Sequence, residues 1–528
     1  MRLPFAPLDW LVLGLYAALL FAGGWIFRPR RSESSRDYFL AGGKVPAWLA
    51  AISVLSATQS AATFIGGPDY GFRHDYTYLA GNIGGLIGAL FVAHFMIPRF
   101  YAIRATTVYE LLERRFDASA MRWAGGMFLI GRIFAGGARV YLAAIALSMV
   151  IFASVDAQGI VLSAALIMLA AFVFTFAGGL RSVLLNDLIQ FVIYLGAALA
   201  VLVWLWTTIP APAATIFEGL RHAPDGADKL RLLDLSFDPS KPFALPAVIV
   251  GLSLLFVAST GTDQDVTQRL LASPDARTGA RGLILSLVAT VPVVWVFVTI
   301  GLLLHVVYVR PELMGGHALA AAADFKGQKI NVFMHYILTE LPAGLRGLVT
   351  CGVFAAAIAT TNSALNAMSS VMVEDFYRPW RQRRRPVADR HYVLAGRWGM
   401  ALAGLAMFAM AVASFYWQRS SDMPLLEFAL QVMVFAYAGL LGVYFTALFS
   451  TRGSTGSVIA ALLAGFCTVL ALQPYVAGAL HLDALVGKLA FPWQLAIGAA
   501  VSTLVCLVPA GRGRDAVVPG DGIEPPTP

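Results

Sequence analysis

Thirteen apolar stretches, most of them about 20 residues long, recur along this chain of 528 residues. A helix of about 20 apolar residues is long enough to cross the hydrocarbon core of a bilayer. The chain is 59% hydrophobic and 13% charged, which leaves too few polar side chains to cover soluble domains of this total size. We therefore expect an all-α polytopic membrane protein. The stretches lie at 8–27, 47–68, 77–98, 119–153, 158–177, 182–207, 245–260, 280–309, 345–372, 391–416, 424–450, 455–475 and 490–510.

The two ends of the chain differ in composition. The first stretch ends in Trp25, Ile26 and Phe27 before "RPRR", without the small residues of a signal-peptide cleavage site, so we expect a retained helix over 8–27. Residues 511–528 are rich in Pro and Gly, which predicts a disordered cytoplasmic tail. The sequence thus predicts one transmembrane domain over 1–510.

Positive charge alternates between the connecting segments. The net charge of +8 comes with an arginine cluster at Arg381–Arg385, and such clusters mark the cytoplasmic side of a membrane protein. This pattern predicts an outside N-terminus and a cytoplasmic C-terminus in a plasma membrane, and a bacterial inner membrane fits it. The basic charge is then a topology signal and gives no reason to expect nucleic acid as a partner.

Two stretches combine apolar residues with an unusual density of Ser, Thr, Gly and Gln. They are "AWLAAISVLSATQSAATFIGGP" at 47–68 and the run ending in "VASTGTDQDVTQR" at 245–269. Broken helices in corresponding places of two halves indicate an inverted-repeat transporter site near the bilayer midplane. Their spacing predicts repeats over 47–207 and 245–450, with 8–27 and 455–510 as additional helices.

Five motifs occur in the same order in a known family. They are "RDYFLAGGKVPAWLAAISVLSATQSAATFIGGP", "TTVYELLERRF", "FAGGLRSVLLNDLIQ", "GTDQDVTQRLLASPDARTGARGLI" and "AAAIATTNSALNAMSSVMVEDFY". With them the chain resembles the solute:sodium symporters, closest to the sialic-acid and monocarboxylate branches. The resemblance implies a LeuT-type fold of 5+5 inverted repeats with two broken helices. It also implies a symporter that imports a small organic solute by alternating access, with Na⁺ as the coupling ion.

Two threonines in the ninth stretch point to a cation site. Thr360 and Thr361 follow Ala357 at i+3 and i+4, so on a helix their hydroxyls converge with its carbonyl. The resemblance assigns the sodium site to Ser56, Gln59, Ala357, Thr360 and Thr361. The alternative is that both hydroxyls bond back to their own helix.

An aspartate in the sixth stretch offers a second position for a cation. An intramembrane carboxylate is costly unless it is paired, so Asp187 is a candidate functional residue. The resemblance implies a second sodium, or a coupling role, for Asp187 with Thr360, Ser363 and the position of Ala364. The alternative is a helix-end aspartate near Arg181.

Two intramembrane arginines are candidates for the solute site. Arg132 and Arg139 lie seven residues apart, on nearly one helical face, and each needs an anionic partner or water. Either Asp187 and helix carbonyls satisfy them, or a solute carboxylate does, which an arginine of this helix binds in the sialic-acid branch. The alternative is a purely structural role for both arginines. Further candidates are the polar residues Thr58, Ser60, Thr63 and Asn82.

Other functional classes are weaker. A proton-coupled transporter of the same fold, using Asp187 and a histidine, is the alternative within transport. A membrane-embedded enzyme would need a catalytic motif such as HExxH or G-x-S-x-G, and the sequence contains neither. A sensor would need a soluble output domain. We therefore expect no enzyme activity and no obligate protein partner, only a small solute and the lipid bilayer.

Overall fold

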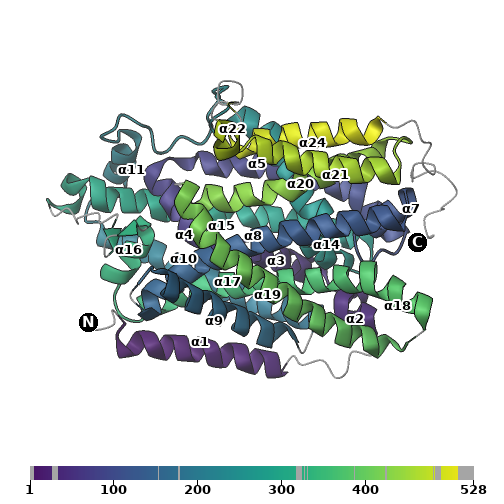
Figure 1. Ribbon diagram of the computed structural model, residues 1–528. Coiled ribbons are helices and arrows are strands. Elements are labelled where there is room, and N and C mark those ends of the chain that lie inside the picture. The colour runs from purple at the N-terminus through teal and green to yellow at the C-terminus, as the bar shows by residue number, and fades with distance from the viewer. Residues whose placement is uncertain are drawn as a thin grey trace.

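The computed structural model describes residues 5–26, 34–152, 154–176, 179–316, 324–325, 328–329, 331–385, 387–421, 425–479, 481 and 489–508. Within these ranges the chain is almost entirely helical, and Figure 1 shows the long helices running side by side. The strands β1 (Asp324–Phe325) and β2 (Gln328–Lys329) form one short antiparallel ladder. The prediction of an all-α polytopic chain is confirmed.

All thirteen apolar stretches contain helix. Within the described ranges, eight helical segments are long and apolar enough to cross a membrane, and the pair Ser35–Gly43 and Ala47–Thr58, bent by 115°, gives a ninth if it is taken as one span. The described residues contain four more apolar helices that are shorter than these spans, at Pro7–Leu20, Ala157–Val173, Thr455–Ala471 and Phe491–Leu507. The exact count of thirteen spanning helices stays a prediction.

Peripheral helices flank the bundle. In Figure 1, α1 (Pro7–Ile26) lies along one side, and α21 (Thr455–Ala471) and α24 (Phe491–Leu507) lie along the opposite side. The helix α1 packs on α10 (Gly179–Thr208) and α17 (Leu345–Val371), whereas α21 and α24 pack on α20 (Leu425–Phe449). These are the helices that the sequence places outside the two repeats, although the repeat boundaries themselves stay a prediction.

The other long helices form the core of the bundle. They are α3 (Ala47–Thr58), α4 (Ala61–Arg73), the run from η2 (Tyr76–Ala80) through α5 (Gly81–Phe91) and η3 (Val92–Met96) to α6 (Ile97–Ala102), α8 (Ala118–Phe152), α9 (Ala157–Phe176), the run from α12 (Leu245–Ala247) through η4 (Val248–Leu252) and α13 (Ser253–Val257) to η5 (Ala258–Thr262), α14 (Gln264–Leu271), α15 (Ala276–Val309) and α19 (Asp389–Ser421). Close approach of α4 and α15 requires glycine, because a Cβ on Gly301 would lie 2.1 Å from the carbonyl oxygen of Pro68.

Both predicted breaks are present. The helix α3 gives way to α4 at Gln59 and Ser60, which have extended backbone, and Ser60 caps α4 by accepting from the backbone N–H of Ala62 at 3.2 Å. In the second break Asp263 is extended (φ −95°, ψ 119°) and caps α14 by accepting from the N–H of Asp265 at 2.9 Å. Each break is therefore one or two residues of extended backbone, and a side chain of the break caps the helix that follows.

Short helices lie at the two ends of the bundle. Figure 1 shows α11 (Ala213–Arg221) and α16 (Val332–Thr339) at one end, and α2 (Ser35–Leu40), α7 (Glu110–Arg115) and α18 (Arg378–Arg384) at the other. The helix α18 contains most of the arginine cluster, so we call this second end the arginine-rich end. The connecting elements η1 (Ala41–Gly43), η6 (Pro311–Met314), η7 (Met372–Tyr377) and α22 (Pro474–Ala479) complete the described chain. The predicted tail at 511–528 lies outside the described residues.

Candidate functional site

A cavity of about 180 Å³ lies between the two breaks. Residues of the first break, Gln59 and Ser60, and of the second, Thr260 and Asp263, line it together. All six predicted solute-site residues also line it: Thr58, Ser60, Thr63, Asn82, Arg132 and Arg139. Phe243, Phe256 and Met433 contribute apolar surface. The structure therefore gathers residues from the helical elements α3, α4, α5, α8, α13, η5 and α20 around one chamber in the bundle.

Two of these polar side chains are also engaged within their own segments. The hydroxyl of Thr58 donates to the carbonyl oxygens of Val54 and Leu55, at 2.9 and 3.1 Å. The amide nitrogen of Asn82 donates to the carbonyl oxygen of Leu79 at 3.0 Å. Local hydrogen bonding and a place on the cavity wall are thus compatible at both positions, because an amide or hydroxyl oxygen still has lone pairs to offer.

Arg132 is satisfied by the protein itself. Its guanidinium lies 3.2 Å from Oδ2 of Asp263 and also contacts the carboxylate of Asp265. The same Oδ2 of Asp263 accepts a hydrogen bond from the hydroxyl of Tyr437 at 2.5 Å. Its partner is therefore neither Asp187 nor a solute, the two possibilities that the sequence suggested.

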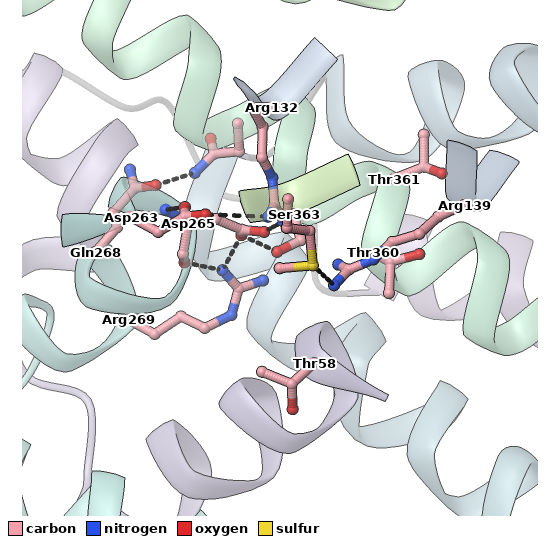
Figure 2. A network of polar contacts seen from close by, with 12 residues as sticks. Thr58, Arg132, Arg139, Asp263, Asp265, Gln268, Arg269, Thr360, Thr361 and Ser363 are labelled. Carbon is pink, nitrogen blue, oxygen red and sulfur yellow. Dashed lines mark hydrogen bonds and ion pairs between the residues drawn. The ribbon is translucent and has the colours of Figure 1, made fainter. Parts of the chain in front are cut away.

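Arg139 is placed differently. Its Nη2 lies 3.3 Å from the sulfur of Met433, and no carboxylate of the described residues lies within ion-pair distance of it. Figure 2 shows Arg132 directed at Asp263 and Asp265, while Arg139 lies apart from them beside the methionine sulfur. A thioether is a weak acceptor, so this guanidinium retains most of its capacity to bind an anion.

The glycines of this helix set the position of both arginines. A Cβ on Gly131 would lie 2.2 Å from the Cβ of Ala436, and one on Gly136 would lie 2.5 Å from the terminal methyl of Met407. These distances show that α8 approaches its neighbours α19 and α20 closely. Both guanidinium groups are thereby brought to the inside of the bundle.

Asp187 belongs to a buried ion-pair network. Its Oδ2 lies 3.2 Å from Nη2 of Arg269 and accepts from the hydroxyl of Ser53. Nη1 of Arg269 lies 2.9 Å from Oδ1 of Asp265, the oxygen that also accepts from Ser363. Thus Asp187 and Ser363 do not meet directly. Asp187 lies buried inside α10 rather than at its end, and the arginine that pairs with it is Arg269.

Three residues of this network were not predicted as site residues: Asp263, Asp265 and Arg269. All three are nearly inaccessible, with exposed fractions of 1%, 0% and 0%. The signal was present in "TDQDVTQR", where three charges fall within seven residues of an interrupted membrane helix. Arg269 is not among the residues that line the cavity.

The residues predicted to bind sodium lie on α3, at its break, and on α17. Ser56 and Gln59 line a small cavity together with Ala355 and Ala356, which places the end of α3 against α17. The hydroxyl of Thr361 donates to the carbonyl oxygen of Ala357 at 2.7 Å, and that of Thr360 donates to Ala356 at 2.9 Å. The hydroxyls therefore do bond back to their helix, with their oxygen atoms left as acceptors.

Known proteins resemble this chain over most of its length. The model of the sodium:solute symporter family matches residues 38–465. The sodium/sialic acid symporter NanT of Aliivibrio fischeri is 28% identical over 480 residues, and SiaT of Proteus mirabilis is 27% identical over 473 residues. Each alignment covers 88% of both proteins. A solved structure of a Na⁺-coupled sialic acid symporter, substrate-bound and outward-open, superposes with a TM-score of 0.79 at 23% identity, covering 97% of this chain and 99% of that one.

Proposed function

Because the chain belongs to the sodium:solute symporter family, whose members are transporters and whose coupling ion is Na⁺, we propose that its solute carries a carboxylate that binds Arg139. The observation that carries this proposal is the contrast between two arginines on one cavity wall. Arg132 has two carboxylates of the protein, whereas Arg139 has none among the described residues. A guanidinium in a low-dielectric chamber requires an anion, and the solute supplies it.

The rest of the cavity suits an acidic sugar. Ser60, Thr63 and Asn82 offer hydroxyl and amide groups for sugar hydroxyls, while Phe243 and Phe256 offer apolar surface for carbon faces or an acyl methyl group. Two relatives that align over 88% of their length are named sodium/sialic acid symporters. We therefore infer that a sialic acid, or a solute of the same acidic-sugar class, is the substrate.

For sodium we infer the site formed by Ser56, Gln59, Ala357, Thr360 and Thr361. The position of Ser56 and Gln59 beside Ala355 and Ala356 supports it, because the end of α3 at its break then lies against α17. An uncharged shell of carbonyl and hydroxyl oxygens suits a hard monovalent cation. Sodium at this place joins the broken helix to α17 and favours the state that accepts solute, and linkage makes that preference mutual.

For Asp187 and Ser363 we infer a coupling role. Both side chains end on the ion-pair network that also holds Arg132 and Asp263 at the cavity wall. A change at Asp187 thereby reaches the solute chamber through Arg269 and Asp265. A second sodium at Asp187 would have to displace or share the Arg269 guanidinium.

The domain boundaries and the orientation remain inferences from the sequence. We infer a transmembrane domain over 1–510, repeats over 47–207 and 245–450, and additional helices at 8–27 and 455–510. The positive-inside rule places the arginine-rich end in the cytoplasm, with the N-terminus outside, in a bacterial inner membrane.

The experiment is a thermal-unfolding panel on the purified full chain. The ligands are N-acetylneuraminate, its methyl ester and the neutral sugar N-acetylmannosamine, each in sodium and in choline. A ligand at 100 times its Kd stabilises the native state by about 2.7 kcal/mol. The acid should therefore raise the midpoint of thermal unfolding in sodium and not in choline. Equal stabilisation by the ester would contradict the carboxylate assignment, and equal stabilisation in choline would contradict the sodium linkage.

A further inference from the structure

One non-helical segment at the arginine-rich end is held in place by side chains from other elements. It comprises residues Thr106–Tyr109, between α6 and α7, and we call it the 106–109 segment. The side chain of Gln264 bonds to it twice. Its Oε1 accepts from the N–H of Val108 at 3.0 Å, and its Nε2 donates to the carbonyl oxygen of Thr106 at 2.9 Å. One amide thereby pairs with the backbone on both sides of Thr107.

Further bonds tie the same segment to other helices. The hydroxyl of Tyr444, on α20, donates to the carbonyl oxygen of Val108 at 2.9 Å. The hydroxyl of Thr107 donates to Asp375, on η7, at 2.6 Å. The hydroxyl of Tyr109 donates to the carbonyl oxygen of Thr262 at 2.9 Å. Gln264, Thr107, Val108 and Tyr109 have no exposed surface.

These bonds join the segment to elements that lie far from it in the sequence. The 106–109 segment falls in the first inferred repeat, and its four partner residues fall in the second, on η5, α14, η7 and α20. In inverted-repeat transporters alternating access is rocking of one group of helices against another about the central site. Because the segment bonds to four different elements, an opening of this end that separates any of them from the segment must break some of these bonds.

The same turn also reaches the solute cavity. Asp263 lines the cavity and pairs with Arg132, and its neighbours Thr262 and Gln264 are the ones that hold the segment. Asp263 has extended backbone between η5 and α14, and Gln264 is the first residue of α14. The cavity wall and the bonds to the 106–109 segment are therefore one residue apart in the chain.

We propose that Gln264 is a positioning residue of the transport cycle: it latches the 106–109 segment, closes the arginine-rich end of the solute pathway, and is released when Asp263 is displaced by a bound solute. The latch itself does not depend on the identity of the solute. Only the release step rests on the proposed function.

The test measures how fast a buried cysteine is modified. The native cysteines Cys351, Cys467 and Cys506 are replaced by Ala. The substitution Val108→Cys then introduces a thiol and keeps the backbone hydrogen bonds of residue 108. Reaction of this thiol with a maleimide–polyethylene glycol reagent reports opening of the arginine-rich end. Gln264→Ala removes the two hydrogen bonds to the segment, worth about 1 kcal/mol each, together with the bond to Ser370, so labelling in sodium without solute should be about thirtyfold faster. Gln264→Glu, which keeps the acceptor for Val108 and loses the donor to Thr106, should give a smaller increase.

The matched control is Gln473→Ala. Gln473 is also a buried amide with three bonds: it donates to Val469 at 3.1 Å and to Gln494 at 2.9 Å and accepts from Gln431, but it lies among the C-terminal helices. The latch is overturned if Gln264→Ala leaves the labelling rate unchanged, or if Gln473→Ala raises it equally. Should Gln264→Ala fail to fold, Tyr444→Phe removes the bond to Val108 from α20 and should accelerate labelling in the same way.

The release step has its own readout. Adding N-acetylneuraminate in sodium should accelerate labelling of the parent several-fold and have little effect on Gln264→Ala, whose latch is already open. If Gln264→Ala labels faster but the acid changes nothing in the parent, the latch stands and the release step is overturned. The thermal-unfolding panel then decides whether the acid binds at all.

Discussion

The guanidinium of Arg269 lies 3.2 Å from the carboxylate of Asp187, and neither side chain has any exposed surface. Removing one partner of a buried pair leaves an uncompensated charge, which costs about 3–5 kcal/mol. We therefore predict that Asp187→Ala lowers the free energy of unfolding by about 3 kcal/mol. The double variant Asp187→Ala/Arg269→Met should lose less than the sum of the two single variants, as measured by a double-mutant cycle of unfolding in detergent.

The exposed pair of Arg73 and Asp69 provides the control. The Arg73 side chain is 55% exposed, so Arg73→Ala should cost less than about 1 kcal/mol. Strict additivity of the Asp187 and Arg269 variants would show that the two charges are not energetically coupled.

The hydroxyl of Thr361 is predicted to be a sodium ligand. Its hydrogen is used by Ala357 at 2.7 Å, so its oxygen lone pairs remain for a cation. Thr361→Val keeps the shape and removes that oxygen, and we expect the sodium concentration for half-maximal stabilisation to rise about tenfold, a loss of about 1.4 kcal/mol. Thr361→Ser should stay near the parent.

Thr446→Val is the matched variant for that measurement. Thr446 is 1% exposed and also bonds back to its helix, to Gly442 at 2.9 Å, but it is not among the proposed sodium residues. A sodium requirement that is unchanged in Thr361→Val, or that rises equally in Thr446→Val, would remove Thr361 from the site.

The sequence predicts the spans and the cavity wall better than it predicts their charge pairing. Apolar length and the clustering of Ser, Thr and Gln are local signals, and they were sufficient to find both breaks and six cavity residues. The partner of Arg132 is not a local property. Asp263 lies 131 positions away in the sequence, and only the packing of α8 against the second break brings the two together.

The sequence also does not predict the partners of the coupling residue Asp187 and of Gln264. Asp187 could be recognised as a buried carboxylate, but its pairing with Arg269 spans 82 positions and overrides the nearby Arg181. The latch at Gln264 is a further example, because its partner Val108 lies 156 positions away. Helix positions follow from the pattern of residues, whereas partners across the bundle follow from the tertiary packing.

Asp275 caps the first turn of α15 and lies outside the membrane-spanning segments. Its carboxylate accepts from the N–H and hydroxyl of Thr278 at 2.8 and 2.9 Å, and the backbone bond is the main reason why the pKa of Asp275 is lowered. A lowered carboxyl pKa in the folded state gives stability that is present above the unfolded pKa of about 3.9 and is lost as the pH falls below it.

We therefore predict that Asp275→Ala costs about 1 kcal/mol at pH 7, and that its difference from the parent shrinks between about pH 4 and pH 3. Asp275→Asn keeps an acceptor without the charge, so its stability should lack this acid step. Unfolding midpoints across the pH range measure both effects. A constant difference between parent and Asp275→Ala down to pH 3 would show that the charged form is not the one that caps.

The two arginines of α8 should respond to substitution in opposite ways. Arg132→Met leaves Asp263 at the cavity wall without its arginine and removes one of the two arginines that contact Asp265, so we expect a loss of roughly 3 kcal/mol in the free energy of unfolding. Arg139→Met removes a guanidinium without a carboxylate partner among the described residues and should leave stability within about 1 kcal/mol of the parent. Only Arg139→Met should fold normally, retain stabilisation by sodium and lose stabilisation by N-acetylneuraminate. If Arg139→Met still binds the acid as the parent does, the solute carboxylate lies elsewhere in the cavity.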